Sequence, residues 1–273
     1  MPRIEIQNCE IAYSTNGAAN RSDDFSVCLV HGAGGRDQDW PQAWRSIDDV
    51  TRAMGLTPAS HIADLDQYPI YSVDLPGHGH SSGTGYSSVD EYADAIEGFI
   101  EALELKRVVL VGHSMGAAIT LLVAIRQNPR LAAVVLIGSA AKLQVSPAIL
   151  DGLQNDFENT VDAIIKYSWY KQTGAFFKEK GRQRMLETGS DVVYGDYYAC
   201  ADFDLTEQLD QVQVPALLIA SDNDRMVRMK DSEATANTLG AKFVGLEECG
   251  HFQHIEQTAK CAKALSEFLT DVA

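Results

Sequence analysis

A serine between two glycines, in the segment Gly-His-Ser-Met-Gly at residues 112–116, is the feature of this sequence with the clearest chemical meaning. The preceding segment, 107–111, is short, apolar and rich in valine, which is typical of a strand buried on both faces. After the turn, apolar residues recur at helical spacing until Pro129 ends the pattern. A strand, a tight turn and a helix would hold the hydroxyl of Ser114 out of the sheet, at a helix N-terminus that favours negative charge. The segment therefore predicts a nucleophilic serine; the alternative is a glycine-rich turn whose serine has no catalytic role.

Candidates for a base and an orienting acid follow later in the chain. His251 comes shortly after a predicted strand at 242–246, and Asp222 and Asp224 come after another at 214–220. An imidazole titrates near neutral pH, so it can take the proton of a serine during attack. A carboxylate can hold that imidazole in the required tautomer. Asp222 lies at the end of its strand and Asp224 lies two residues farther into the loop, so both can be placed in this role.

In chain order, these segments supply a serine, an aspartate and a histidine, and in this they resemble the α/β-hydrolase superfamily. The resemblance covers nearly the whole chain. Residues 27–35 are similar to the family's strand and oxyanion loop, and residues 71–81 to its next strand and glycine-rich loop. The family's usual pattern is a glycine, two variable residues and then the acid. With Ser221 in place of that glycine, the resemblance places the acid at Asp224, and Asp222 would brace the turn.

The resemblance also implies an oxyanion hole made of backbone N–H groups. One donor would be the N–H of Met115, directly after the nucleophile, and the other the N–H of Ala33 in the small-residue loop. Three further histidines, His31, His78 and His113, lie in loops of the family pattern. We expect them to make structural hydrogen bonds and not to act as extra bases or metal ligands.

Eight predicted strands alternate with helical segments, which indicates an α/β fold with a mainly parallel sheet and helices on both faces. The first two strands should form an antiparallel edge. The resemblance implies that residues 1–140 and 213–273 form the core domain. It also implies that residues 141–212 form a helical cap, or lid, inserted before the penultimate core strand. The strands are expected near 3–7, 9–13, 25–30, 70–74, 107–111, 133–138, 214–220 and 242–246.

Residues 141–212 contain ten of the 22 aromatic residues of the chain. Some of them must form the core of this segment, and others are expected to face the substrate cavity. The sequence does not separate the two groups. The predicted pocket residues are Gly32, Gly34, Trp169, Tyr170, Phe176, Phe177, Tyr197 and Phe252.

A locally basic stretch runs from Lys171 to Arg184 in this otherwise acidic chain. Positive charge at the site would help an anionic substrate to approach. Arg182 and Arg184 are the preferred candidates, because a guanidinium pairs with carboxylate or phosphate in a two-pronged way. The alternative is a solvated helix face.

Composition narrows the class of protein. A length of 273 residues with 45% hydrophobic residues is enough for one large core. The net charge of −16 speaks against nucleic acid and anionic membrane surfaces as partners. The longest apolar run, 131–141, is shorter than the roughly 18 residues that a membrane span needs, and the first residues predict a strand instead of a signal peptide. Five scattered cysteines predict reduced thiols, a cytoplasmic location and no structural zinc.

The leading hypothesis is a serine hydrolase that cleaves a small or medium carboxylic ester through an acyl-enzyme, without metal or cofactor. It would act on a small molecule as a monomer or homodimer. An alternative is a thioesterase, or a hydrolase or lyase acting on a C–C bond with the same triad, because fold does not decide among these reactions. A non-catalytic ligand receptor on this scaffold is an alternative of another class. The haloalkane dehalogenases and epoxide hydrolases of this family have an aspartate at the position of the nucleophile. Their chemistry is disfavoured here because this chain has Ser114 at that position.

Overall fold

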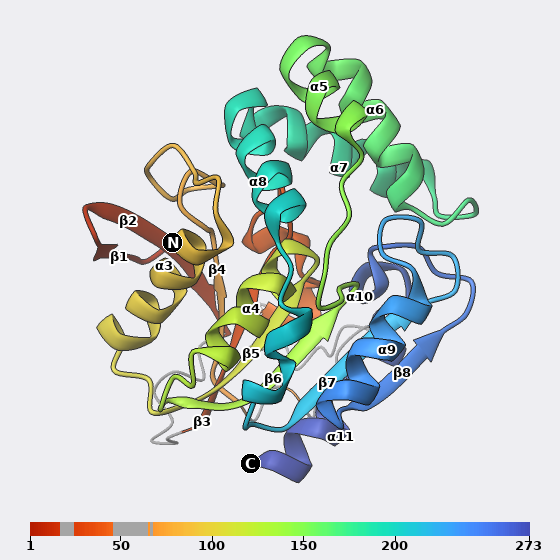
Figure 1. The fold of residues 1–273 in the computed structure, drawn as a ribbon. Helices are drawn as coiled ribbons and strands as arrows, with labels where there is room; N and C mark the ends of the chain where they lie inside the picture. Colours follow the sequence, from red (N-terminus) through yellow and green to blue (C-terminus); the bar gives the residue numbers. More distant parts are fainter. Residues whose placement is uncertain (17–24, 46–64, 66–67) are drawn as a thin grey trace, which may run out of the picture.

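One eight-stranded sheet runs through the protein (Figure 1). The computed structural model describes residues 1–16, 25–45, 65 and 68–273. The strands lie in the order β1-β2-β4-β3-β5-β6-β7-β8. Their bounds are β1 Arg3–Ile6, β2 Cys9–Thr15, β3 Phe25–Val30, β4 Ile70–Val73, β5 Arg107–His113, β6 Leu131–Ile137, β7 Ala216–Ser221 and β8 Lys242–Leu246.

The predicted topology of the sheet is confirmed. β1 pairs with β2 and β2 with β4 in antiparallel fashion, and the other neighbouring strands are parallel. β5 extends to His113, two residues past its predicted end, because Gly112 and His113 continue the ladder with β6. β7 begins at Ala216, two residues after its predicted start, and Pro215 before it has no N–H to donate to a ladder.

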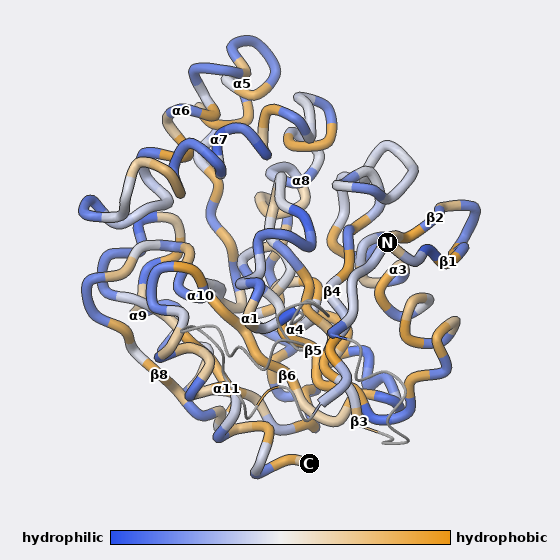
Figure 2. Tube along the Cα trace, turned by 180° about the vertical axis from the view of Figure 1, so that it is seen from behind, coloured by the Kyte–Doolittle hydropathy of each residue, from blue (hydrophilic) through white to orange (hydrophobic). Residues whose placement is uncertain are grey.

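Helices cover both faces of the sheet. On one face lie α3 (Val89–Ala102), α4 (Met115–Ile125) and α9 (Met229–Leu239), and their apolar residues form one core cluster with the strands. On the other face α11 (Thr258–Val272) packs in a second cluster, together with Trp44 of the short helix α1 (Gln42–Arg45). Figure 2, seen from behind, shows α11 and α1 on this second face.

The central strand β5 contributes to both clusters. Leu110 belongs to the cluster of α3 and α4, whereas its neighbours Val109 and Val111 belong to the cluster of α11. Successive side chains of a strand point to opposite faces, so a strand between two helical layers must be apolar on both. This burial accounts for the continuous apolar run before Ser114.

Between β6 and β7 four helices form a layer of their own. They are α5 (Pro147–Asn155), α6 (Phe157–Ser168), α7 (Ala175–Thr188) and α8 (Ser190–Asp202), and they lie beyond the end of the sheet at which β5 passes into α4 (Figure 1). We call residues 141–212 the helical insertion. A third apolar cluster belongs mainly to this insertion and includes Leu153, Val161, Ile164, Trp169, Met185, Val193 and Tyr197.

The two ends of the helical insertion meet. Lys142 and Asp204 form an isolated antiparallel bridge, and the Lys142 ammonium lies 2.8 Å from the Asp204 carboxylate. A short 3-10 helix, η3 (Thr206–Gln211), then returns the chain to β7. The insertion therefore leaves and rejoins the core at one place. Among the described helices, none is both long and apolar enough to cross a membrane.

Candidate active site

The turn from β5 into α4 holds Ser114 in a strained backbone conformation. Its φ of 54° and ψ of −119° are unusual for a residue with a side chain. Such a conformation persists only where the surrounding structure holds it in place. A Cβ on Gly112 would overlap the carbonyl of Gly116, and a Cβ on Gly116 would overlap the carbonyl of Val30. Both glycines are therefore needed for α4 to approach the sheet. The Ser114 N–H donates to Ile137 O of β6 at 2.9 Å, which ties the turn to the neighbouring strand.

His251 and Asp224 form a buried pair after β8 and β7. The His251 Nδ1 lies 2.8 Å from Asp224 Oδ2, and the two side chains are 6% and 1% exposed. The other oxygen, Asp224 Oδ1, accepts the backbone N–H groups of Met226 at 2.8 Å and Val227 at 2.9 Å. Because Asp224 Oδ2 accepts from Nδ1–H, the free lone pair of the imidazole is on Nε2. Asp222, the other candidate acid, is exposed and does not contact the histidine.

Neighbouring groups hold the backbone around His251. His113 Nε2 donates to the carbonyl of His251 at 2.8 Å. Burial, together with the nearby His254 and His251, lowers the pKa of His113 well below its usual value, so the ring is neutral and its single N–H points to that carbonyl. On the other side, the N–H of His251 donates to Ser168 O, at the end of α6, at 2.6 Å. The helical insertion thus contacts the histidine loop directly.

The loop after β3 carries the predicted oxyanion donor Ala33. The N–H of Gly34 donates to Asp196 Oδ2 at 2.7 Å, and the N–H of Gly35 donates to Gly32 O at 3.1 Å. Met115, the other predicted donor, is the first residue of α4, so its N–H has no acceptor within the helix. The two predicted donors therefore lie at the start of α4 and in the loop that faces it.

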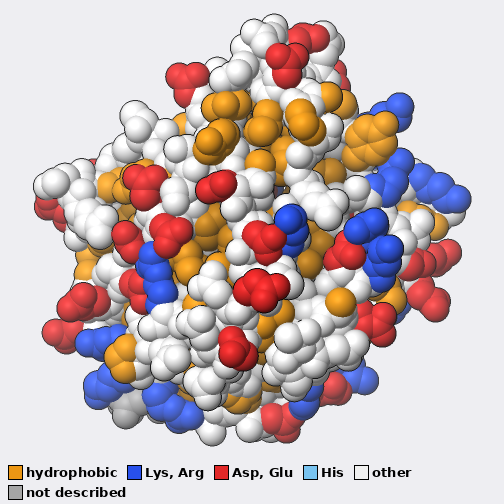
Figure 3. Space-filling model, in the orientation of Figure 1, with side chains coloured by type: hydrophobic (Ala, Val, Ile, Leu, Met, Phe, Trp, Pro, Cys, Tyr) orange, Lys and Arg blue, Asp and Glu red, His pale blue; other side chains and the backbone are white. Residues whose placement is uncertain are grey.

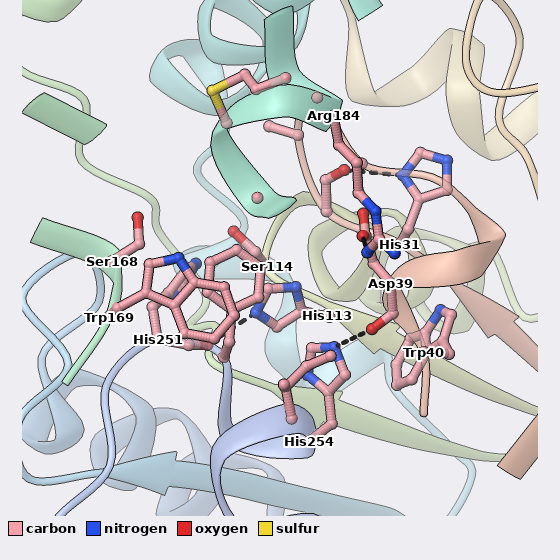
Figure 4. A pocket seen from close by; sticks show the side chains of 18 of the residues that line it. His31, Asp39, Trp40, His113, Ser114, Ser168, Trp169, Arg184, His251 and His254 are labelled. Atoms are coloured by element: carbon pink, nitrogen blue, oxygen red, sulfur yellow. Dashed lines mark hydrogen bonds and ion pairs between the residues drawn. The ribbon is translucent and has the colours of Figure 1, made fainter. Parts of the chain in front are cut away.

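A cavity of about 500 Å³ lies between the core and the helical insertion. Ser114, His251 and Ala33 are on its wall, and Ser114 Oγ makes no hydrogen bond to another described residue. In a ligand-free site the bond between nucleophile and base is often long and forms fully only with substrate. Figure 4 shows His251 and Trp169 on one side of Ser114, and Asp39 and Arg184 on the other.

Most of the predicted pocket residues line this cavity. Tyr170 is the exception: its backbone N–H donates to Glu256 at 3.0 Å, and its side chain does not reach the cavity. The ring of Trp169 stacks on Phe252, with centroids 4.3 Å apart. The predicted residues on the wall are Gly32, Gly34, Trp169, Phe176, Phe177, Tyr197 and Phe252.

Sequence reasoning missed the aliphatic part of the lining. It comes from four places: the segment after β6, the inward face of the insertion helices, the loop after Asp224 and the short helix α10 (Gln253–Glu256) after His251. Whether an apolar residue of a helix faces the cavity or the core of the insertion depends on how the helices pack, and no motif marks these positions. The residues are Leu143, Val145, Ile165, Met185, Met226, Val227 and Ile255.

The two arginines of the basic stretch have partners already. Arg182 does not line the cavity; its Nε lies 2.5 Å from an oxygen of Asp162 on the exposed side of the insertion. For Arg182 the geometry favours the alternative, a solvated helix face, because α7 turns this residue outward. Arg184 lines the cavity, but its guanidinium pairs with Asp39. Figure 3 shows hydrophobic side chains gathered across the front of the insertion, with lysine and arginine side chains to one side.

The described residues contain no group of three or more His, Cys, Asp or Glu side chains arranged to hold a metal ion.

Comparisons with known proteins show the family and the fold of this chain. The model of the alpha/beta hydrolase family matches residues 29–264. The 3-oxoadipate enol-lactonase 1 of Acinetobacter baylyi is 22% identical over 213 residues, which cover 76% of this chain and 80% of that protein. The pimeloyl-[acyl-carrier protein] methyl ester esterase of Cronobacter sakazakii is 26% identical over 253 residues, covering 86% and 85%. The structure of a thermophilic esterase superposes with a TM-score of 0.80 at 26% identity, covering 100% of this chain and 98% of that one.

A buried histidine in the cavity wall generates a prediction about stability. His254 is 1% exposed, its Nε2 lies 3.2 Å from Asp39 O, and burial lowers its pKa to about 3. In the unfolded chain this imidazole binds a proton near pH 6.5. Since the unfolded state then binds more protons, the free energy of unfolding should decrease as pH falls below about 6.5. From pH 6.5 to 5 this histidine alone should contribute a loss of about 1.5 kcal/mol.

Urea unfolding of the wild type and His254→Asn at pH 6.5, 5.5 and 5.0 measures this loss. Between pH 6.5 and 5.0 the free energy of unfolding should fall by about 1.5 kcal/mol less in the variant than in the wild type. This difference does not depend on the stability of the variant at pH 6.5. Parallel pH dependences in the two proteins would show that His254 does not titrate in this way.

Proposed function

Since the chain belongs to the alpha/beta hydrolase family, we propose that it hydrolyses a small or medium carboxylic ester through an acyl-enzyme on Ser114. The observation that carries the proposal is the buried His251–Asp224 pair on the wall of the cavity that also exposes Ser114. A histidine oriented by a carboxylate in a substrate-sized cavity is what an activated serine requires. The enol-lactonase and the methyl ester esterase among its relatives act on ester bonds by name, which supports the same bond type here.

The proposed reaction has two steps. In the first, Ser114 Oγ attacks the ester carbonyl carbon while His251 Nε2 takes its proton, and the carbonyl oxygen becomes an oxyanion. The N–H groups of Ala33 and Met115 donate to that oxyanion. As the C–O bond of the ester breaks, His251 gives the proton to the departing alcohol. In the second step, water attacks the acyl-enzyme, His251 takes a proton from it, and this proton returns to Ser114 as the acid leaves.

The lining of the cavity supports an uncharged substrate of medium size. The walls of the cavity as a whole are mainly apolar, and its volume of about 500 Å³ is in the range of small-molecule sites. The guanidinium of Arg184 is paired with Asp39. In this proposal residues 141–212 act as the cap that excludes bulk water from the reacting ester, which strengthens the electrostatic interactions in the site.

Covalent labelling tests the nucleophile. A fluorophosphonate probe should add once to the folded protein, because an activated serine attacks phosphorus, and the adduct should be absent in Ser114→Ala. Intact mass followed by peptide mapping locates it. No adduct on folded protein that still binds esters would favour a non-catalytic receptor, and an adduct at another residue would refute the assignment of Ser114.

The orienting acid is tested by a matched pair of variants. Asp224→Asn should lower kcat by about 10⁴, because the imidazole loses the partner that holds its tautomer. Asp222→Asn makes the same change two residues away on the exposed side of the loop, and it should stay within about tenfold of the wild type. Ester hydrolysis followed with both purified variants gives the result. The reverse order would move the triad acid to Asp222.

A panel of p-nitrophenyl esters measures the acyl preference. Each methylene buried in the apolar cavity should raise kcat/KM about fourfold, until the cavity is full at about four to eight carbons. Longer chains should then lose activity. Acyl-CoA thioesters of the same chain lengths belong in the same experiment. Faster turnover of the thioesters would favour the thioesterase alternative, and turnover of neither series would contradict the proposal.

A further inference from the structure

A carboxylate of the helical insertion, Asp196 on α8, is fully buried although it is not part of the proposed triad. Removing a charged carboxylate from water is costly unless charged or polar groups surround it. Three segments of the core converge on it. Its partners therefore indicate what this position does for the protein.

Each partner of Asp196 comes from a different loop or helix. Oδ2 accepts the N–H of Gly34 in the oxyanion loop at 2.7 Å and lies 2.8 Å from Nε2 of His78, in the loop after β4. Oδ1 accepts the hydroxyl of Tyr92, on α3, at 2.6 Å. One carboxylate of the insertion thus links the oxyanion loop to two other parts of the core.

The surroundings of His78 favour the doubly protonated ring. Its Nδ1 lies 3.0 Å from the carbonyl of Pro76 and its Nε2 faces Asp196, so both ring nitrogens meet acceptors. Burial by itself lowers the pKa of His78, but the charge and hydrogen bond of Asp196, the Pro76 carbonyl and Asp74 outweigh it and raise the pKa. The imidazolium and the carboxylate form an ion pair in which both side chains are 0% exposed.

His31, at the end of β3, is the neutral neighbour of this pair. Its ring centroid lies 4.9 Å from that of His78, and burial together with the His78 charge lowers its pKa well below the usual value. Nε2 accepts the N–H of Leu75 at 3.0 Å, so the proton is on Nδ1, which lies 2.8 Å from Gly32 O. His31 therefore donates to the carbonyl of the peptide that carries the N–H of Ala33.

These contacts determine the direction of the predicted oxyanion donor. In a trans peptide the carbonyl and the N–H point in opposite directions. Gly32 O accepts from His31 and from the N–H of Gly35, so the N–H of Ala33 points away from both. The following peptide is held by Asp196 through the N–H of Gly34. Both peptide planes around Ala33 are thus anchored by hydrogen bonds.

We propose that Asp196 is a positioning residue, through which the helical insertion holds the oxyanion loop in the geometry that stabilises the transition state. This inference rests on the proposed function, because it takes the N–H of Ala33 as an oxyanion donor. The insertion then acts in the chemical step as well as enclosing the substrate. It does so from α8, through a side chain that does not line the cavity.

The first test is Asp196→Asn, which keeps the side-chain volume and removes the charge. An oxyanion donor acts mainly in the transition state, so kcat for p-nitrophenyl butyrate should fall about 10- to 100-fold with KM within about threefold. Asp202→Asn makes the same change at an exposed position near the end of the same helix, and both constants should stay within about twofold. An Asp196→Asn protein that is folded and has the wild-type kcat would overturn the proposal, as would a rise in KM at constant kcat.

A pH profile separates positioning from a general loss of stability. The pKa of His78 is raised in the folded state, so its stabilising proton is present below about pH 6.5 and is lost as pH rises through the folded-state value. The groups facing it are Asp196, Tyr92, Asp74 and His31. The kcat of the wild type should therefore decline at alkaline pH, and this decline should be absent from Asp196→Asn and His78→Gln. The same alkaline decline in all three proteins would contradict the proposal.

A milder variant keeps the proposal testable if Asp196→Asn does not fold. Tyr92→Phe removes one hydrogen bond from Asp196 and leaves its ion pair with His78 in place, so kcat should fall about two- to fivefold at constant KM. An unchanged kcat in this variant would then overturn the proposal. Failure of the proposed function looks different: the wild type itself would neither turn over esters nor take up the fluorophosphonate at Ser114.

Discussion

The close approach of α4 to the sheet is the constraint on which the rest of the site depends. Only glycine fits at positions 112 and 116, because any side chain there would meet the backbone of α4 or of β3. This approach forces Ser114 into a positive-φ conformation and directs its hydroxyl away from the strands. The N-terminus of α4 then lies beside the serine, and the N–H of Met115 has no acceptor within the helix. The proposed nucleophile and the proposed oxyanion donor of α4 thus depend on one packing contact between a helix and two strands.

The helical insertion contributes to the same site through its backbone as well as through the cavity wall. Ser168 O accepts the N–H of His251, and the N–H of Tyr170 and the N–H of Gly250 both donate to Glu256. The insertion therefore contacts the loop that carries the histidine. Through Asp196 it also contacts the oxyanion loop. Loops are more mobile than the elements they connect. The hydrogen bonds from the helical insertion therefore supply the rigidity that the proposed base and the proposed oxyanion donor require.

Each buried carboxylate beside this site has a histidine as its partner, and two other histidines nearby are neutral. Asp224 has His251 and two backbone N–H groups, and Asp196 has His78. Burial lowers the pKa of His113 and His254, so both donate a single hydrogen bond to a carbonyl without adding positive charge beside the base.

The sequence by itself determined the sheet and the order of the chemical groups along it. Runs of apolar residues separated by helical patterns can only be buried as parallel strands between two helical layers, and the loops at one edge of such a sheet carry Ser114, the two candidate acids and His251. The neighbourhood of each group was decided by tertiary structure. Asp196 meets Gly34 across 162 positions of the chain, and no local pattern distinguishes it from Asp202 on the same helix. Packing likewise decided which face of each insertion helix points toward the cavity. Apolar and charged residues of α7 do not fall on separate stripes, so the direction in which each side chain points follows from the neighbours it packs against and from the ion pairs they offer.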